Sequence, residues 1–139
     1  YISMKIIKEI GLPEKDFFIW FDDTEYSLRI LKYSKIRNIN TAILNHKTKL
    51  VANAGFSWKS YYGLRNQIVI IKKYYSRLVL IKNILKMKKM ILGGKILAKI
   101  KKNDYYCKVS KMYEDALRDG LKEKLGKNSQ YLSNFKLEK

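Results

Sequence analysis

The sequence predicts a mostly α-helical chain with one or two short strands, an α+β arrangement. Apolar residues recur at helical spacing through most of the 139 residues, and only two short runs in the first third have a pattern typical of strands. Seven Gly and one Pro are too few for a low-complexity chain, and 47% hydrophobic residues are enough to form a core. Because two strands are too few for an independent sheet, we expect them to belong to something larger.

Three elements are expected at the start of the chain. A short helix over residues 2–10 carries a stripe of isoleucines, and Gly11 is placed to cap its end. The apolar run 17–21 is too short for a helix by itself and predicts a buried strand or an extended segment. An amphipathic helix then runs from residue 26 to about Ser34.

The middle of the chain predicts a strand followed by a long helical region. Apolar and polar residues alternate over 39–43, which is typical of a strand and brings His46 into the loop after it. From Ser57 or Ser60, either of which can cap a helix, apolar residues at helical spacing continue to Met90. Two helices are expected there rather than one.

Two glycine positions are expected to end helices in the second half. The pair Gly93-Gly94 predicts a break or a sharp kink, because each Gly inside a helix costs about 1 kcal/mol relative to Ala. A last helix over 105–119 is expected to end at Gly120 as its C-terminal cap.

The charge is concentrated in the middle of the chain. The formal net charge is +18, of which residues 35–102 contribute +17 without a single carboxylate. Such a stretch is expected to bind phosphates, either of nucleic acid or of a membrane and its lipid carriers. The single cysteine, Cys107, excludes an internal disulfide and a cysteine zinc site, which fits a reducing compartment. No uncharged apolar stretch approaches the ~20 residues that span a bilayer.

The acidic run at residues 22–25 has two interpretations. Asp22 as N-cap and Glu25 three positions later can form a capping box, and spacing alone favours this structural interpretation. In the functional interpretation, the five large apolar residues before Asp22 bring the carboxylates into a confined place, where one of them can act as a general base.

Three further features carry candidate chemistry. His46 can join a metal site only with carboxylates from elsewhere, and an exposed or hydrogen-bonded imidazole is the plainer interpretation. An aromatic and polar cluster begins the long helical region: Trp58, Tyr61, Tyr62, Arg65 and Asn66. Core packing explains the aromatic residues, whereas Arg65 and Asn66 could equally grip a phosphate or a sugar. The lysines of 82–102 form either a solvated face or a surface for an anionic partner.

Several short motifs follow one another along most of the chain. They are Gly11-Leu12-Pro13, Phe17-Phe18-Ile19-Trp20-Phe21-Asp22-Asp23-Thr24-Glu25-Tyr26-Ser27-Leu28-Arg29, His46, Tyr61-Tyr62-Gly63-Leu64-Arg65-Asn66, Ala116-Leu117-Arg118-Asp119-Gly120-Leu121 and Gly126-Lys127. In this order and spacing the chain resembles the C-terminal part of a bacterial family 2 glycosyltransferase of the GT-A type. The similar branch contains the rhamnosyltransferase-like and galactofuranosyltransferase-like enzymes. The Trp-x-Asp-Asp-x-Glu-Tyr-x-x-Arg block is the most specific of these motifs.

The resemblance implies an inverting transfer of a sugar from a nucleotide-sugar donor to an acceptor hydroxyl, in the assembly of a cell-surface polysaccharide or glycolipid. Asp23 matches the family's general base, which takes the proton of the acceptor hydroxyl. Trp20, Asp22 and Glu25 match its acceptor-binding positions.

The resemblance also implies a metal. His46 matches a histidine that helps to coordinate a divalent ion, Mn²⁺ or Mg²⁺, at the donor diphosphate. Arg65 and Asn66 belong to a family motif for which structural bracing is the default interpretation and phosphate binding the alternative. The nucleotide-binding half of the family would precede residue 1, so that this chain by itself is expected to lack donor binding and activity.

The same resemblance divides the chain in two. Residues 1–56 would be the C-terminal part of the GT-A catalytic domain, on the acceptor and base side, and residues 57–139 a basic helical region. The basic helices are then expected to lie peripherally on the cytoplasmic, inner face of the cell membrane, where lipid-linked acceptors reside. A homo-oligomer of this chain stays an open alternative.

Two hypotheses of other classes stand beside the glycosyltransferase. A basic helical nucleic-acid-binding module would use the +17 segment and interleaved tyrosines that stack on bases, although no helix-turn-helix or zinc-finger spacing occurs. A helical scaffold or oligomerisation unit is the third.

Overall fold

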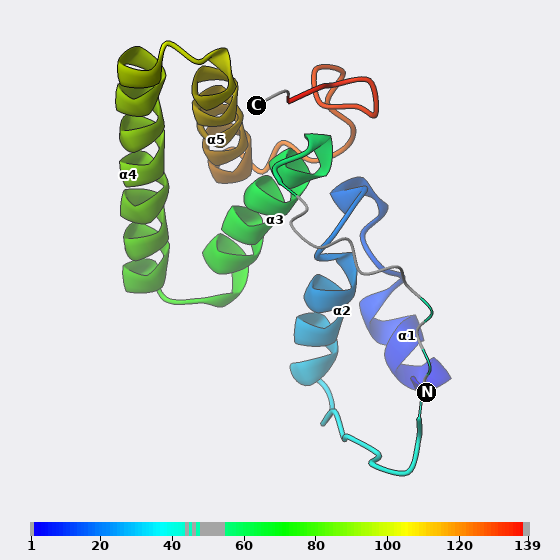
Figure 1. Cartoon of the computed structure of the whole chain (residues 1–139). Coiled ribbons are helices and arrows are strands. Elements are labelled where there is room, and N and C mark those ends of the chain that lie inside the picture. Colours follow the sequence, from blue (N-terminus) through cyan, green and yellow to red (C-terminus); the bar gives the residue numbers. More distant parts are fainter. Residues whose placement is uncertain (1, 44, 46, 48–54, 138–139) are drawn as a thin grey trace.

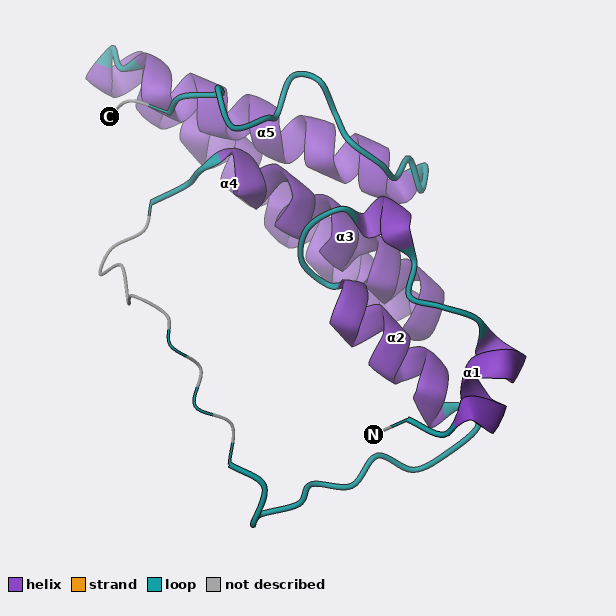
Figure 2. Cartoon of the chain, turned by 90° about the vertical axis from the view of Figure 1, so that its right-hand side faces the viewer, coloured by secondary structure: helices purple, strands orange, loops and turns teal. Residues whose placement is uncertain are grey.

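The structure of the chain is a computed structural model that describes residues 2–43, 45, 47 and 55–137. Five α-helices and one short 3₁₀ helix form within this part of the chain (Figure 1). They are α1 (Met4–Ile10), the 3₁₀ helix Lys15–Phe17, α2 (Asp22–Leu31), α3 (Trp58–Tyr74), α4 (Arg77–Lys101) and α5 (Asp104–Leu121). Figure 2 shows the helices gathered together.

The described residues contain no strand, so the predicted α+β fold class, a GT-A portion with one or two short strands, is wrong. Residues 17–21 form the end of the 3₁₀ helix and a turn, and residues 39–43 form an irregular, exposed connection. An apolar run or an alternating run becomes a strand only when a neighbouring strand accepts its backbone hydrogen bonds. Residues 17–21 bond instead to side chains of α3, as described below.

The predicted end of α1 at Gly11 and the predicted start of α3 at Ser57 are confirmed, while α1 begins two residues later than predicted. Ser3 caps the start of α1 and Gly11, at φ 76°, follows its last residue. Ser57 caps α3 in a reciprocal capping box with Ser60. The predicted division of the long helical region is also confirmed, because α3 ends before Tyr75 and α4 begins a new helix.

The predicted break at Gly93-Gly94 is wrong, because α4 continues through both residues. The reason lies in α5. A Cβ on Gly94 would lie 2.2 Å from the hydroxyl oxygen of Ser110, which is buried. Gly94 therefore lets α4 and α5 approach closely, and this packing offsets the cost of glycine in the helix.

Gly120 is likewise not a helix cap. It lies inside α5, which ends one residue later, and is buried against α3. A Cβ at this position would lie 2.8 Å from the carbonyl oxygen of Arg65 and 2.9 Å from the Cβ of Ile68. The residue marks a close crossing of two helices rather than an end.

The core lies where α5 packs against both α3 and α4. Its buried side chains are Tyr61, Tyr62, Ile68, Met87, Ile91, Met112, Tyr113, Ala116, Leu117 and Tyr131. A smaller cluster of Phe17, Val69 and Ile70 joins the 3₁₀ helix to α3. Among the helices described, none is long and apolar enough to cross a bilayer.

Candidate functional site

The turn between the 3₁₀ helix and α2 has an unusual backbone. Phe18, Trp20 and Phe21 have φ values of 65°, 61° and 70°. Residues with a Cβ rarely adopt positive φ, and each such residue costs on the order of 1 kcal/mol. A turn with three of them persists only when its surroundings hold it, and such strain is typical of functional sites.

Two buried polar side chains of α3 hold this turn. The side-chain amide nitrogen of Asn66 donates to the carbonyl oxygens of Phe17 at 3.0 Å, Ile19 at 3.0 Å and Trp20 at 2.9 Å. Arg65 Nη2 donates to the Phe17 carbonyl oxygen at 3.2 Å, and Arg65 Nε donates to the Asn66 side-chain oxygen at 2.9 Å. The pair thus provides the donors that a neighbouring strand would otherwise supply.

The C-terminal loop completes this arrangement. Arg65 Nη1 donates to the carbonyl oxygen of Gly126 at 2.6 Å, and the Gly126 N–H donates to the carbonyl oxygen of Asp16 at 2.6 Å. The guanidinium also lies over the rings of Tyr61 and Tyr62. Its polar hydrogens are committed to backbone carbonyls and to Asn66, so these contacts support the bracing role of Arg65 and leave little for a phosphate.

Tyr61 anchors the same loop to α5. Its hydroxyl donates to Asp119 Oδ2 at 2.6 Å and accepts from the side-chain amide of Asn128 at 3.1 Å. Burial and the Asp119 carboxylate raise the pKa of Tyr61 to about 12, so the phenol stays protonated as a donor.

Trp20 lies half in solvent at the end of this turn. Its side chain is 49% exposed, and its indole packs against α3 at Gly63. A Cβ on Gly63 would lie 2.7 Å from the indole Cε3 atom, so no larger residue allows this approach without displacing the ring. The indole therefore rests on α3 and presents the rest of its surface to solvent.

Asp22 and Asp23 follow Trp20 in the first turn of α2, and both are exposed. The predicted capping box is wrong, because the cap residue is Phe21 in the left-handed region and makes no side-chain cap bond. Asp23 Oδ1 accepts the backbone N–H of Thr24 at 2.6 Å.

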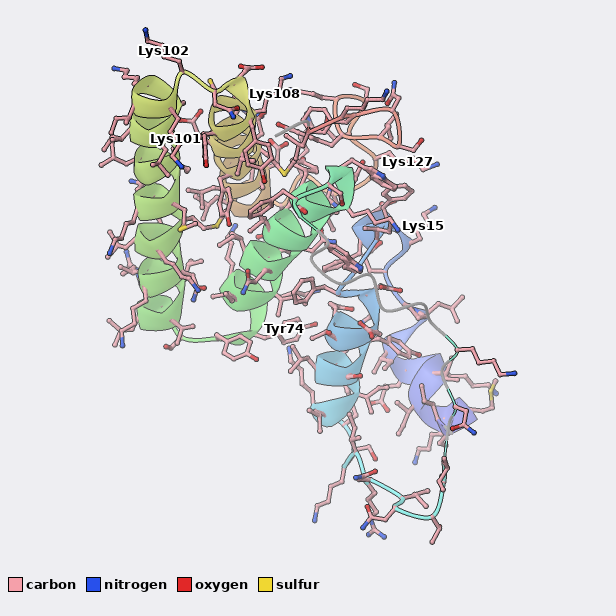
Figure 3. The ribbon with its side chains drawn as sticks, in the orientation of Figure 1. Lys15, Tyr74, Lys101, Lys102, Lys108 and Lys127 are labelled. Carbon is pink, nitrogen blue, oxygen red and sulfur yellow. The ribbon has the colours of Figure 1, made fainter. Side chains whose placement is uncertain are left out.

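Glu25 lies apart from these two carboxylates. It is fully buried and accepts hydrogen bonds from Arg29 at 2.9 Å, Lys73 at 3.1 Å and the Tyr74 hydroxyl at 2.6 Å. Burial raises the pKa of Glu25, but the hydrogen bonds from Tyr74 and Lys73 and the charges of Lys73 and Arg29 outweigh it, so the net pKa is lowered. Figure 3 shows Tyr74 at the end of α3 that faces α2. The hydrogen bonds from Lys73 and Tyr74 to Glu25 therefore join α3 to α2.

Two lysines, Lys15 and Lys127, lie near the turn before α2. Figure 3 shows Lys15 and Lys127 on the same side of the molecule, and the Lys127 ammonium lies 5.0 Å from the ring centroid of Phe18. A small cavity of about 140 Å³ lies beside Lys127. Its lining consists of Tyr61, Arg65, Lys124, Leu125, Gly126, Lys127, Asn128 and Ser129.

The predicted metal site lies largely beyond what the structure describes. His46 is outside the described residues. Within the described part, no three side chains of the metal-binding types gather. Asp22 and Asp23 alone do not make a complete set of ligands for Mn²⁺ or Mg²⁺. The metal role of His46 stays a prediction.

The structure brings together some of the predicted site residues and separates others. Three of them are neighbours and exposed: Trp20 in the turn before α2, and Asp22 and Asp23 in the first turn of α2. Arg65 and Asn66 of α3 donate hydrogen bonds to the carbonyl oxygens of Phe17 and Trp20 in that turn. Sequence reasoning missed Lys73 and Tyr74 as partners of Glu25. The only local sign of that network is the spacing of Glu25 and Arg29, four residues apart on one helix face.

No family model, curated protein or solved structure matches the chain.

Proposed function

We propose that this chain is the acceptor-side part of an inverting glycosyltransferase, similar to the family 2 enzymes, with Asp23 as the general base. The observation that carries the proposal is the strained turn that presents Trp20, Asp22 and Asp23 to solvent while Asn66 holds its carbonyl groups. An indole packs on the C–H face of a sugar ring, and carboxylates accept hydrogen bonds from its hydroxyl groups. Trp20 and Asp22 would bind the acceptor in this way.

The proposed reaction is a single displacement at the anomeric carbon. Asp23 takes the proton of the acceptor hydroxyl as the acceptor oxygen bonds to the anomeric carbon. The bond between that carbon and the diphosphate oxygen breaks, and the nucleoside diphosphate leaves with the electron pair. The nucleotide-sugar would be bound by a part of the enzyme outside this chain, where a divalent metal would neutralise the diphosphate.

The charge of the chain supports a place at a membrane. Lipid-linked acceptors lie at the inner face of the cell membrane, and residues 35–102 carry +17 without a carboxylate. We therefore propose that the enzyme works there, peripherally, in the assembly of a cell-surface polysaccharide or glycolipid.

The test is sugar transfer by an enzyme that contains this chain together with a nucleotide-sugar-binding part. With dTDP-rhamnose or UDP-galactofuranose as donor, release of the nucleoside diphosphate should require an added glycan or glycolipid acceptor. Asp23→Asn should lower kcat by about 10²–10⁴-fold with little change in donor KM. Asp104→Asn is the matched control, since Asp104 is also an exposed carboxylate in the first turn of a helix. Equal kcat values for the two variants would overturn the role of Asp23.

The nucleic-acid-binding alternative is an outcome of a second measurement. Of the interleaved tyrosines that this hypothesis would use for stacking on bases, Tyr61 and Tyr62 are buried in the core, whereas Tyr75 is 54% exposed. Binding of duplex or single-stranded DNA that falls steeply with salt, together with no sugar transfer, would favour the alternative.

A further inference from the structure

Helix α4 has two apolar faces. One face packs on α5 and buries Met87 and Ile91, with Gly94 at the close contact to Ser110. The other face carries a row of exposed aliphatic side chains: Leu78, Ile81, Leu85, Leu92, Ile96 and Ile100. They are spaced three, four or seven residues apart and therefore lie along one side of the helix.

We call these six side chains the outer stripe. Leu78 is 71% exposed, Leu85 60%, Leu92 62% and Ile100 72%. The stripe runs from Leu78 to Ile100, which is 22 residue steps or about 33 Å at 1.5 Å per residue. Single exposed apolar residues need no explanation, but a row of six over this length marks an interaction surface. In Figure 1, α4 stands at the outer edge of the molecule, beside α5.

Basic side chains border the outer stripe on both sides. At helical spacing, Lys82 and Lys86 follow one edge, Arg77, Lys88, Lys95 and Lys99 follow the other, and Lys89 lies within the row between Leu85 and Leu92. All seven are exposed, and α4 contains no acidic residue. Lys95 forms an ion pair with Glu114 of α5. The remaining edge cations surround the stripe with positive charge.

We propose that the outer stripe docks on an anionic lipid bilayer, with α4 lying in the plane of the surface. The aliphatic side chains would enter the boundary between headgroups and acyl chains, and the two rows of cations would meet lipid phosphates. This pattern of a central apolar row and basic borders is typical of interfacial helices.

The charge argues against the other two occupants. A second copy of the chain would place lysine rows against lysine rows, and α4 has no acidic residue to pair with them. Nucleic acid would meet the lysines, but six aliphatic side chains gain nothing against a phosphate backbone. An anionic surface with an apolar interior matches both parts of the pattern.

The first test is sedimentation of the 139-residue chain with phosphatidylcholine vesicles, with and without phosphatidylglycerol. Binding should require phosphatidylglycerol. Lys82→Gln with Lys86→Gln and Lys89→Gln should weaken it about a hundredfold. The control is a triple variant with the same charge change at exposed positions outside α4: Lys5→Gln, Lys8→Gln and Lys35→Gln. It should weaken vesicle binding much less. Equal losses for the two triple variants would overturn the proposal.

The second test addresses the apolar contact. Leu85→Ser with Leu92→Ser should weaken vesicle binding about a hundredfold, whereas Leu12→Ser with Leu31→Ser, at exposed leucines elsewhere, should not. The Ile96→Trp variant reports contact with the lipid directly, through tryptophan fluorescence, and does not depend on weakening the binding. Its added emission should shift to the blue on vesicles and be quenched by brominated lipid, while Leu31→Trp should show neither effect.

Three further results would overturn the docking proposal. They are an Ile96→Trp signal unaffected by brominated lipid, a dimer in sedimentation equilibrium that Leu85→Ser with Leu92→Ser dissociates, or phosphatidylcholine binding equal to that of the anionic vesicles. No sugar donor is present in these experiments. Failure of vesicle binding and failure of sugar transfer are therefore separate outcomes.

Discussion

The side-chain amide of Asn66 lies 2.9 Å from the carbonyl oxygen of Trp20 and joins the middle of α3 to the turn before α2. The two residues are 46 positions apart in the chain. This contact fixes the peptide group immediately before Phe21, from which α2 and its carboxylates begin. The exposure of Asp22 and Asp23 therefore depends on a buried side chain of another helix.

Asn66→Ala should destabilise the fold by about 3 kcal/mol, because it leaves several buried carbonyl groups without their donor. Urea unfolding followed by circular dichroism measures the change. The control is Asn83→Ala, which removes one local bond to the carbonyl oxygen of Val79 and should cost less than about 1 kcal/mol. Similar costs for the two variants would contradict the bracing role of Asn66.

Gly63→Ala should displace the indole of Trp20, since a Cβ would lie 2.7 Å from its ring. In a Trp58→Phe background the emission of Trp20 should shift to the red as the ring moves into water. Gly93→Ala, where a Cβ meets nothing within 4 Å, is the control and should leave the emission unchanged. An unshifted spectrum in Gly63→Ala would show that the ring does not rest on α3.

Glu25 should make the stability of the fold depend on pH. Its pKa is lowered in the folded chain, so its contribution is complete above the unfolded value of about 4.3 and is lost as the pH falls through the folded value. Glu25→Gln should lower the free energy of unfolding at neutral pH by about 2 kcal/mol and flatten its fall in acid. Glu9→Gln, at an exposed position of α1, should do neither. Unfolding in urea between neutral pH and pH of about 3 gives both quantities, and a parallel pH dependence in Glu25→Gln and the native chain would refute the assignment.

Gly120→Ala should cost about 2 kcal/mol, because the added methyl group would meet the backbone of Arg65 and the side chain of Ile68. Gly93→Ala in α4 is the matched control and should stabilise the helix by roughly 0.5–1 kcal/mol. Thermal unfolding of both variants measures the difference. A stabilising Gly120→Ala would mean that α3 and α5 do not cross as closely as described.

The local signals in the sequence predicted helices well where short-range contacts decide them. The bonds that end α1 near Gly11 and begin α3 at Ser57 join residues within four positions of each other. Two adjacent glycines such as Gly93 and Gly94 are typical of a helix break. Helix α4 nevertheless continues through them, because Ser110 of α5 packs against Gly94. Intrinsic preference is weaker than such packing.

For the candidate site, too, the sequence indicated some features and only long-range contacts decided others. The resemblance to family 2 glycosyltransferases singled out Trp20, Asp22 and Asp23, which are neighbours in the sequence and are all exposed in the structure. It could not distinguish them from Glu25, because the buried position of Glu25 depends on Lys73 and Tyr74, which lie 48 and 49 residues further on.

The sequence by itself determined the helical character of the chain, several helix ends and the concentration of positive charge over residues 35–102, since these follow from local spacing and composition. Only the tertiary structure decided that 17–21 is a strained turn rather than a strand, and that one face of α4 stays apolar and uncovered. The physical reason is the same for both. Whether a backbone carbonyl or an aliphatic side chain finds a partner depends on residues that folding brings together from far along the chain.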